Sequence, residues 1–453
     1  MPAVMRAAAA AERAGVPAVA IGGGGFEPMG RAIGKSLGIP HVPIVSYPGV
    51  ILTDETDVFR AKMRETVAPE VLAALTASSS AAPDGDDTEP APRQVIFTGD
   101  LDAVQDHFEE RGWTDGLPIV PPTIDRIEAF LAHTRRVPDE VIGVLAPESR
   151  ESSVWNVAVN GVMAGCRPEY LPVLLGIAEC LADPEFRIMD AGSTPGWEPL
   201  AVVSGPVVER LGFNSGTGAM RIGRRANSSI GRFVRLYLRN LPGLRIPPEH
   251  TDQGAIAGSF NVVLAENDAA VRELGWPSYR HDEGFGDDDS VVSVRSCVTV
   301  SAPIYSAGEN ALDHLHSLAL IFGNAIGPWA YTGLEFGAWN PLLVLGPSIA
   351  TALAHFGVGK DQLRAYLAEH MLISVAELER CAWAVGSTNF RVADVAESDP
   401  RYAGEDPDRL VPMCPRAEDI AVVVAGNANR NQSRGYVQNH VQGVPVTRRI
   451  ELP

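Results

Sequence analysis

The chain has 453 residues, a net charge of −19 and a hydrophobic content of 45%. This length allows two or three domains with large buried cores, and the acidic balance argues against nucleic acid as a partner, because phosphates attract basic surfaces. No apolar run reaches the length of a membrane span and no basic and apolar signal segment opens the chain, so we expect a cytoplasmic protein without a membrane partner.

The cysteines are few and scattered. Their number is odd and no two of them stand in C-x-x-C spacing. This pattern disfavours a disulfide framework and a structural zinc site, and it fits a reducing compartment.

The first elements resemble part of a doubly wound α/β unit over residues 1–76. The order of apolar and polar residues predicts helices over Ala3–Ala14 and Phe26–Leu37, and strands over Ala18–Ile21 and Val42–Tyr47. Such a unit normally opens with a strand. We therefore expect the first strand to be lost, to be supplied by another chain, or to be cut off by the chosen start of the sequence. As partner, we expect a second copy in a homo-oligomer or a partner chain that completes this unit.

Three motifs carry a family resemblance. The run AERAGVPAVAI, the spacing F-x-x-M-G-x-A-x-G-x-x-L-G-I-P and a strand ending in Tyr-Pro together span residues 11–48. This stretch resembles the bacterial UGSC (seleno)proteins. The resemblance implies an upstream loop of selenocysteine or cysteine followed by Gly-Ser-Cys, and the sequence contains no Cys-Gly-Ser-Cys. A thiol redox role of this unit is therefore not supported by its residues.

Residues 77–94 are small, acidic and rich in proline, which predicts a flexible linker. Residues 95–453 then predict a larger mixed α/β domain. Its motifs GWTDGLPIVPPT and NGVMAGCRPEYLPV resemble a bacterial domain that accompanies the UGSC unit, and they name no reaction. Within the first motif, Asp115 stands before glycine, which favours a turn over a site carboxylate.

Cys166 and Glu169 mark one candidate catalytic position. Pro168 predicts the first turn of a helix that runs to Leu181, with Glu169 near its positive end. A cysteine just before a helix has its thiol pKa lowered, and it would act as a nucleophile or redox thiol with Glu169 as acid or base. The alternative is a small buried apolar side chain.

A basic island follows. Residues 210–248 contain eight arginines and no Asp, Glu or Lys, beside a loop rich in Gly, Asn and Ser. We predict an anion site in which Arg232 acts on the substrate, because arginines beside a helix start and small polar loops favour anions. The other predicted substrate-binding residues are Asn214, Ser215, Asn227, Ser228, Ser229 and Arg235. The alternative is a solvated face.

Two similar segments indicate a diverged internal repeat. WEPLAVVSGP starts at Trp197 and WNPLLVLGP starts at Trp339, and in each a strand enters Gly-Pro and then a helix. With the helices that precede them, they predict a duplicated α–β–α unit around residues 165–212 and 311–357. The two helix starts would then face each other across a cleft for a small anion.

A metal site is the weaker alternative. Asp313 and His316 share one side of a predicted helix, but the stronger zinc signal of two histidines four residues apart is absent.

The sequence therefore predicts an α/β protein that acts on a small anionic, carboxylate- or thiol-bearing metabolite, as an oxidoreductase or lyase of unknown cofactor. Two alternatives stay open. One is a non-catalytic scaffold subunit completed by a partner chain, and the other is a metal-dependent lyase or hydrolase.

Overall fold

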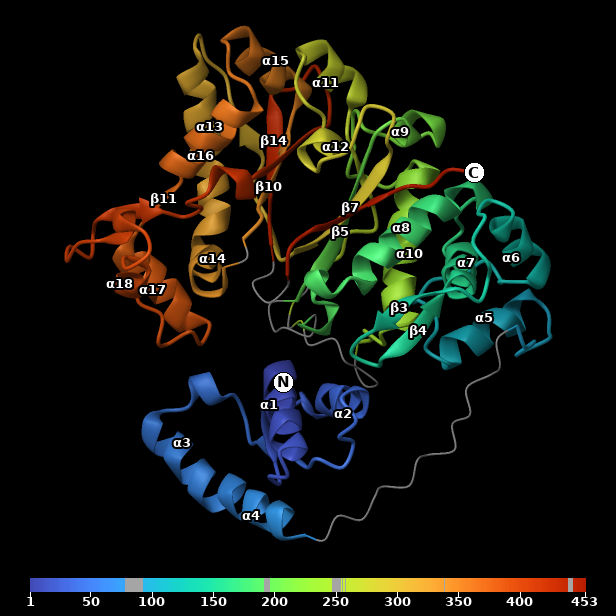
Figure 1. The fold of residues 1–453 in the computed structure, drawn as a ribbon, viewed down its shortest axis with the longest axis vertical. Helices are drawn as coiled ribbons and strands as arrows, with labels where there is room; N and C mark the ends of the chain where they lie inside the picture. Colours follow the sequence, from blue (N-terminus) through green and yellow to red (C-terminus); the bar gives the residue numbers. More distant parts are fainter. Residues whose placement is uncertain are drawn as a thin grey trace.

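The computed structural model describes residues 1–77, 93–190, 196–246, 254, 256, 258–337, 339–438 and 443–453. The predicted linker therefore lies mostly outside the described residues. The fold is mixed α/β, as predicted, and Figure 1 shows a small N-terminal unit in blue beneath a larger unit.

The N-terminal unit is built around two parallel strands. Strand β1 (Ala20–Gly23) pairs in register with β2 (Ile44–Tyr47), and the helices α1 (Pro2–Arg13) and α2 (Glu27–Ser36) bury Met5, Met29 and Ile33 against them. A second helical run follows, made of α3 (Thr56–Lys62), the π-helical turn η2 (Met63–Val67) and α4 (Ala68–Thr76). The predicted helices and strands are present with ends shifted by one or two residues.

The larger unit contains two main sheets. In the first, the strand order is β15-β7-β5-β6; in the second it is β13-β10-β14-β8, with β9 also pairing β14. The bounds are β5 (Glu198–Ser204), β6 (Leu264–Ala265), β7 (Val291–Cys297), β8 (Thr299–Val300), β9 (Ile304–Tyr305), β10 (Leu342–Leu345), β13 (Ala421–Val424), β14 (Gln432–Val437) and β15 (Val446–Arg449).

The two sheets pack face to face between two helical layers. Alternate residues of each strand point to opposite faces of its sheet. Leu200 and Val202 of β5 share a core with Leu342 and Val344 of β10 between the sheets. The residues on the outer faces, such as Ala201 of β5, join the cores beneath the helices. Strands buried on both faces read as continuous apolar runs, as these do. The four layers are visible across Figure 1, from α13 and α16 through the strands to α8 and α10.

Each sheet is covered on its outer face by a layer of helices. On the first sheet lie α7 (Val154–Met163), α8 (Leu171–Ala182) and α10 (Arg225–Asn240), and on the second lie α13 (Ala311–Ile326), α15 (Pro347–His355) and α16 (Lys360–His370). The remaining elements are α5 (Leu101–Glu110), α6 (Ile124–Leu131), β3 (Val141–Leu145), β4 (Arg150–Ser153), α9 (Val207–Arg210), α11 (Asp268–Leu274), α12 (Tyr279–Asp282), α14 (Ala330–Phe336), β11 (Leu372–Ser374), α17 (Val375–Ala384), α18 (Val392–Val395) and β12 (Leu410–Pro412).

The two sheets repeat one pairing scheme. Strand β5 pairs β6 in parallel and β7 antiparallel, and β10 pairs β13 in parallel and β14 antiparallel. The glycine after each central strand leaves no room for a side chain, since a Cβ on Gly205 or Gly346 would lie 2.3 Å from a backbone oxygen of the neighbouring strand's start. The sequence echo from Trp197 and Trp339 therefore coincides with equivalent strands.

Each half also lends a strand to the other. Strand β8 follows β7 after one residue but pairs β14 of the second sheet. Strand β15, in turn, follows β14 and pairs β7 of the first sheet. Backbone hydrogen bonds join the exchange, including one of 2.8 Å from the Val298 N–H to the Val437 carbonyl. The two halves are thus interlocked along one seam.

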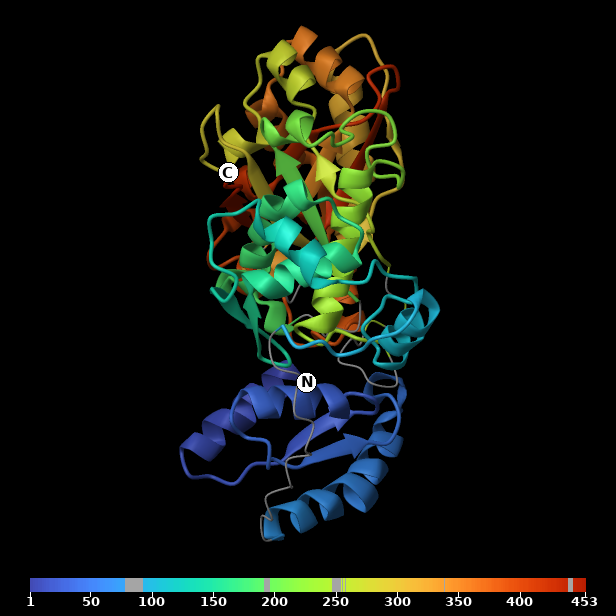
Figure 2. The ribbon, with the colours of Figure 1, turned by 90° about the vertical axis from the view of Figure 1, so that its right-hand side faces the viewer.

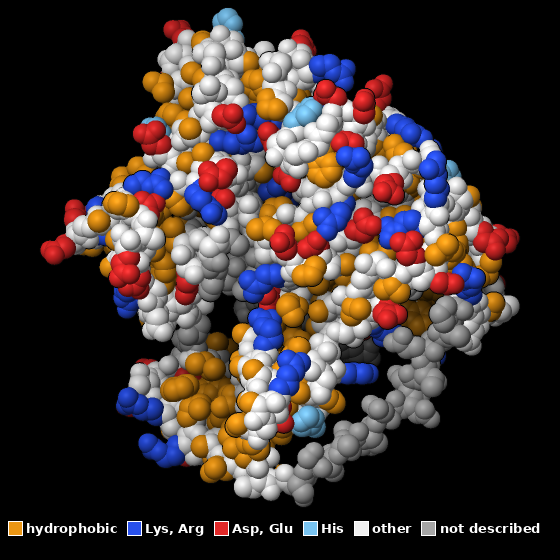
Figure 3. Space-filling model, viewed as in Figure 1, with side chains coloured by type: hydrophobic (Ala, Val, Ile, Leu, Met, Phe, Trp, Pro, Cys, Tyr) orange, Lys and Arg blue, Asp and Glu red, His pale blue; other side chains and the backbone are white. Residues whose placement is uncertain are grey.

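The surface differs between the two units. In Figure 3, acidic and basic side chains are interspersed over the larger unit, and hydrophobic side chains gather on the N-terminal unit at the bottom. Figure 2 shows the ribbon of the N-terminal unit, in blue, and of the larger unit from the side. Among the described residues, no helix has both the length and the apolar character needed to cross a bilayer.

Candidate functional site

The two arginines of the basic island that were predicted to contact the substrate are paired with acids in the structure. Arg232 donates two hydrogen bonds of 2.8 and 2.9 Å to the Asp115 carboxylate, and Arg235 donates one of 2.9 Å to Glu198. Both acids lie outside the segment in which we counted charges. Because a carboxylate already occupies each guanidinium, this island offers less to an added anion than its composition suggests.

The polar loop residues serve the backbone. Asn227 is fully buried and bonds the amide N–H and carbonyl of Asn214 and the Val263 carbonyl, at 2.7–3.0 Å. The Ser215 carbonyl accepts from the Gly426 N–H, the Ser228 hydroxyl accepts from the Gly223 N–H, and the Ser229 hydroxyl donates to the Arg225 carbonyl. Helix α10 begins at Arg225 with Arg224 as N-cap, so Asn227 and Ser228 lie inside its first turns and do not cap it.

The hydrogen bond from the Ser229 hydroxyl to the Arg225 carbonyl oxygen is 2.6 Å long and lies within the helix. Such back-bonding satisfies the hydroxyl internally. These side chains therefore shape the loop and the helix start.

Cys166 lies close to part of the predicted site and is buried. Burial raises its pKa to about 12, against smaller lowering effects of Ser229, Arg225 and Arg232. The expected lowering by the helix start is therefore wrong, since desolvation of the thiolate dominates. Glu169 lies in a short 3-10 turn and pairs at 3.6 Å with Arg167 on the surface.

The weak metal candidates stay apart from other ligands. Asp313 accepts from the Asn310 side chain in the first turn of α13, and His316 is exposed one turn later. Across the described ranges, no group of three or more His, Cys, Asp or Glu side chains is arranged to hold a metal ion.

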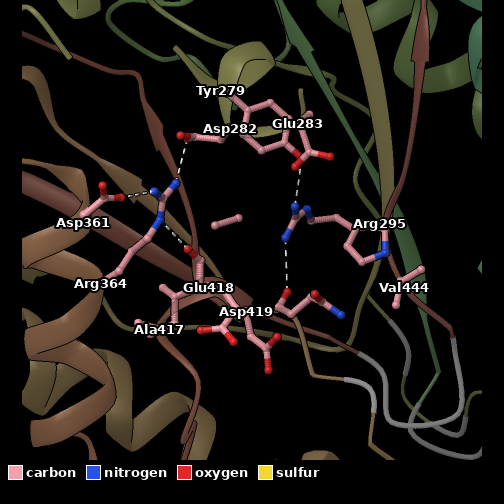
Figure 4. A pocket seen from close by; sticks show the side chains of 14 residues that line it. Tyr279, Asp282, Glu283, Arg295, Asp361, Arg364, Ala417, Glu418, Asp419 and Val444 are labelled. Atoms are coloured by element: carbon pink, nitrogen blue, oxygen red, sulfur yellow. Dashed lines mark hydrogen bonds and ion pairs between the residues drawn. The ribbon is translucent and has the colours of Figure 1, made fainter. Parts of the chain in front are cut away.

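A cavity of about 470 Å³ lies elsewhere, at the edge of the two sheets. It is formed where β7 approaches the segments that enter β10 and β13, with α12 and α16 beside them (Figure 4). Its charged and hydroxyl-bearing lining consists of Tyr279, Asp282, Glu283, Arg295, Asp361, Arg364, Glu418 and Asp419. This volume suits a small metabolite.

Arg295 is the unusual member of this lining. Only 3% of it is exposed, yet none of the ion pairs among the described residues includes it. Its Nη1 donates to the Asn340 carbonyl at 3.1 Å, its Nη2 donates to the Tyr279 hydroxyl at 3.0 Å, and its Nε has no partner. Because a buried charge is costly without a counter-charge, an uncompensated guanidinium on a cavity wall fits an anion that comes from outside.

Behind Tyr279 lies a buried charged cluster. Glu266, at the end of β6, accepts from the Ser204 hydroxyl at 2.6 Å and from the Tyr279 N–H at 2.8 and 2.9 Å. The Lys360 Nζ lies 3.9 Å from Glu266 and 2.8 Å from Asp282. Burial raises the pKa of Glu266 to about 7, opposed by Lys360. Glu266 is linked to the cavity through Lys360 and Asp282. A carboxyl with a pKa near neutral can exchange protons with a ligand through such groups.

The raised pKa of Glu266 makes stability depend on pH. Because the folded-state pKa of about 7 exceeds the ordinary glutamate pKa of 4.5, the favourable contribution of the protonated form is complete below pH 4.5 and is lost as pH rises through 7. We expect Glu266→Gln to remove this loss. Its unfolding free energy in urea should gain about 3 kcal/mol relative to the native protein between pH 4.5 and pH 8.

The matched control is Glu109→Gln on α5, where the side chain is exposed. Its pH profile should run parallel to that of the native protein. If the profile of Glu266→Gln were also parallel, the carboxyl would not hold its proton in the folded state.

The equivalent position in the other half is filled. By strand pairing, Arg295 corresponds to Tyr436, since they oppose Leu200 and Leu342. Asn340 corresponds to Glu198, because each follows the repeated tryptophan. There the Tyr436 ring packs on Phe260 at 5.9 Å, and Glu198 is paired with Arg235. The duplicated framework thus keeps an uncompensated charge and an open cavity on one side while its counterpart is packed.

The sequence reasoning missed Glu266, Tyr279, Arg295 and Lys360. One signal was present for two of them. Arg295 interrupts the apolar run of a buried strand, and Glu266 directly follows another. Charged residues at such positions need a partner or a function. Lys360 and Tyr279 carry no comparable signal, because their burial depends on how helices pack across the two halves.

Among known proteins and families, a match was found only for the N-terminal unit. A search of curated proteins and a search of solved structures found no match. The match to a family model ends at residue 77 and leaves the larger unit uncovered. It confirms the resemblance expected from the motifs of the first unit: residues 2–77 match the model of the UGSC family.

Proposed function

We propose that the chain is an enzyme that acts on a small carboxylate-bearing metabolite in the cavity beside β7. The observation that carries the proposal is the buried guanidinium of Arg295, which has hydrogen-bonding capacity left and no ion pair among the described residues. A charge-assisted hydrogen bond to a ligand carboxylate would compensate this charge and hold the ligand against the cavity wall.

The chemistry available to a bound ligand is proton transfer. Asp282 lines the cavity, and it contacts Lys360, which in turn lies near Glu266. Burial raises the pKa of Glu266 to about 7, so these three groups can take part in acid and base steps. The described lining contains no cysteine, so the thiol chemistry expected from Cys166 has no support at this cavity.

The proposal predicts that small carboxylates bind and that Arg295 holds them. Titration calorimetry with malonate and with valerate as probes should detect binding to the full chain. We expect Arg295→Met to weaken this binding by about tenfold or more, the equivalent of one lost charge-assisted hydrogen bond.

Two variants serve as controls. Arg380→Met removes an exposed arginine paired with Glu377 on α17, and it should leave binding unchanged. Arg232→Met tests the basic island directly. If Arg232→Met rather than Arg295→Met removed binding, the site would lie at the island. If no carboxylate bound, the enzyme proposal would give way to the scaffold alternative.

A further inference from the structure

The cavity is not uniformly suited to an anion. Five carboxylates line it against two guanidinium groups. Within the lining, Arg364 contacts both Asp282, at 2.7 Å, and Asp361, at 3.0 Å. Asp282 also meets Lys360, so this side of the cavity is internally compensated.

The remaining charges are separated. Figure 4 shows Arg295 on one side of the central space, with Glu283 above its guanidinium and Glu418 and Asp419 below it. Asp419 is paired at 2.8 Å with Arg416. Glu283 accepts a hydrogen bond of 2.6 Å from the Thr447 hydroxyl, and none of the ion pairs among the described residues includes Glu283 or Glu418. One buried cation, one half-buried acid and one exposed acid therefore line the same space without an ion pair among the described residues.

We infer that the ligand is a zwitterion, an amino acid or a related carboxylate that also carries a cationic amine. This inference rests on the proposed function and specifies its substrate class. The ligand carboxylate meets Arg295, and the ammonium group meets Glu283 and Glu418. Each group of the ligand then supplies a charge that the cavity lacks.

The charge of the whole protein favours the same class. A ligand with only negative charge must approach a chain of net charge −19 and enter a space lined by five carboxylates. A zwitterion has no net charge, so the long-range repulsion vanishes while both local attractions remain. The acidic wall thus discriminates against simple carboxylates by leaving its own charges unpaired.

The test compares two probes that differ only in the amine. Calorimetric titration of the full chain with 5-aminovalerate and with valerate should show the amine-bearing probe binding about tenfold tighter, the equivalent of one charge-assisted hydrogen bond. L-alanine and propionate form a second, shorter pair. The double variant Glu283→Gln and Glu418→Gln should erase the preference, whereas its affinity for valerate should hold or rise. Arg295→Met should weaken both probes.

The outcomes separate the two proposals. Equal binding of 5-aminovalerate and valerate, with loss of both in Arg295→Met, overturns the zwitterion and leaves the carboxylate enzyme standing. Binding of neither pair overturns both. A preference for the amine that survives the double glutamine variant also overturns the inference, because the amine would then be recognised elsewhere. Glu109→Gln is the control for a neutralised exposed acid.

Discussion

Replacing Gly346 by alanine is expected to lower the unfolding free energy by about 3 kcal/mol or more. A Cβ at this position would lie 2.3 Å from the Gln432 carbonyl oxygen and 3.2 Å from its carbon. Backbone atoms at the start of β14 cannot rotate away as a side chain can. Relief therefore requires β10 and β14 to separate, at the centre of the second sheet. Urea unfolding measures the effect.

The control is Gly357→Ala, at the end of α15. Its φ of +77° strains an alanine, but no atom within 4 Å opposes the added methyl. A loss of about 1 kcal/mol is expected there. Gly205→Ala should behave like Gly346→Ala, because its Cβ meets the Asp289 carbonyl oxygen at 2.3 Å. Equal losses in Gly346→Ala and Gly357→Ala would contradict the close approach of the strands.

Replacing Lys360 by methionine is the second large effect. This ammonium group is nearly fully buried between Glu266 and Asp282, and its removal leaves two carboxylates with less compensation. Breaking a buried ion pair in this way costs about 3–5 kcal/mol. We expect a loss of that size at pH 8 by urea unfolding. The loss should shrink at pH 5, where Glu266, with its pKa of about 7, is already protonated.

A double variant tests the cause. In the Glu266→Gln background, Lys360→Met should cost at least about 1 kcal/mol less than in the native background, since the two groups interact directly. The exposed Lys35→Met on α2 is the control for loss of a lysine. Additive losses for Lys360 and Glu266 would show that the two side chains do not share one network.

The sequence predicted the local elements better than the partners of its charges. Apolar runs around Val202 and Val423 identify buried strands because hydrophobic periodicity is local. Helices α16 and α17 are separated by β11, whose hydrogen bonds to β12 come from a segment about 40 residues further along the chain and have no local sequence signal. Strand β6 is short for a related reason: of the apolar run Val262–Ala265, only Leu264 and Ala265 pair with β5.

The candidate site was harder to predict because charge compensation is non-local. Arg232 meets Asp115 from 117 positions away, and Arg235 meets Glu198 from outside the basic run. A count of charges within residues 210–248 therefore indicated an anion site, although Arg232 and Arg235 are paired with acids from other parts of the chain. Arg295, which carries the proposed function, lies in a window of ordinary composition, and only its surroundings in space distinguish it.

The exchange of β8 and β15 limits how this molecule can move. Domains that close on a substrate often do so about a hinge, with each lobe turning as a rigid body. Here β8 of the first half pairs with the second sheet and β15 of the second half pairs with the first sheet. A rotation that moved the two sheets apart would therefore break hydrogen bonds at both strands. Admission of a metabolite must then depend on small displacements at the rim, in the turn of α12 and the start of α16, while the paired strands behave as a single rigid block.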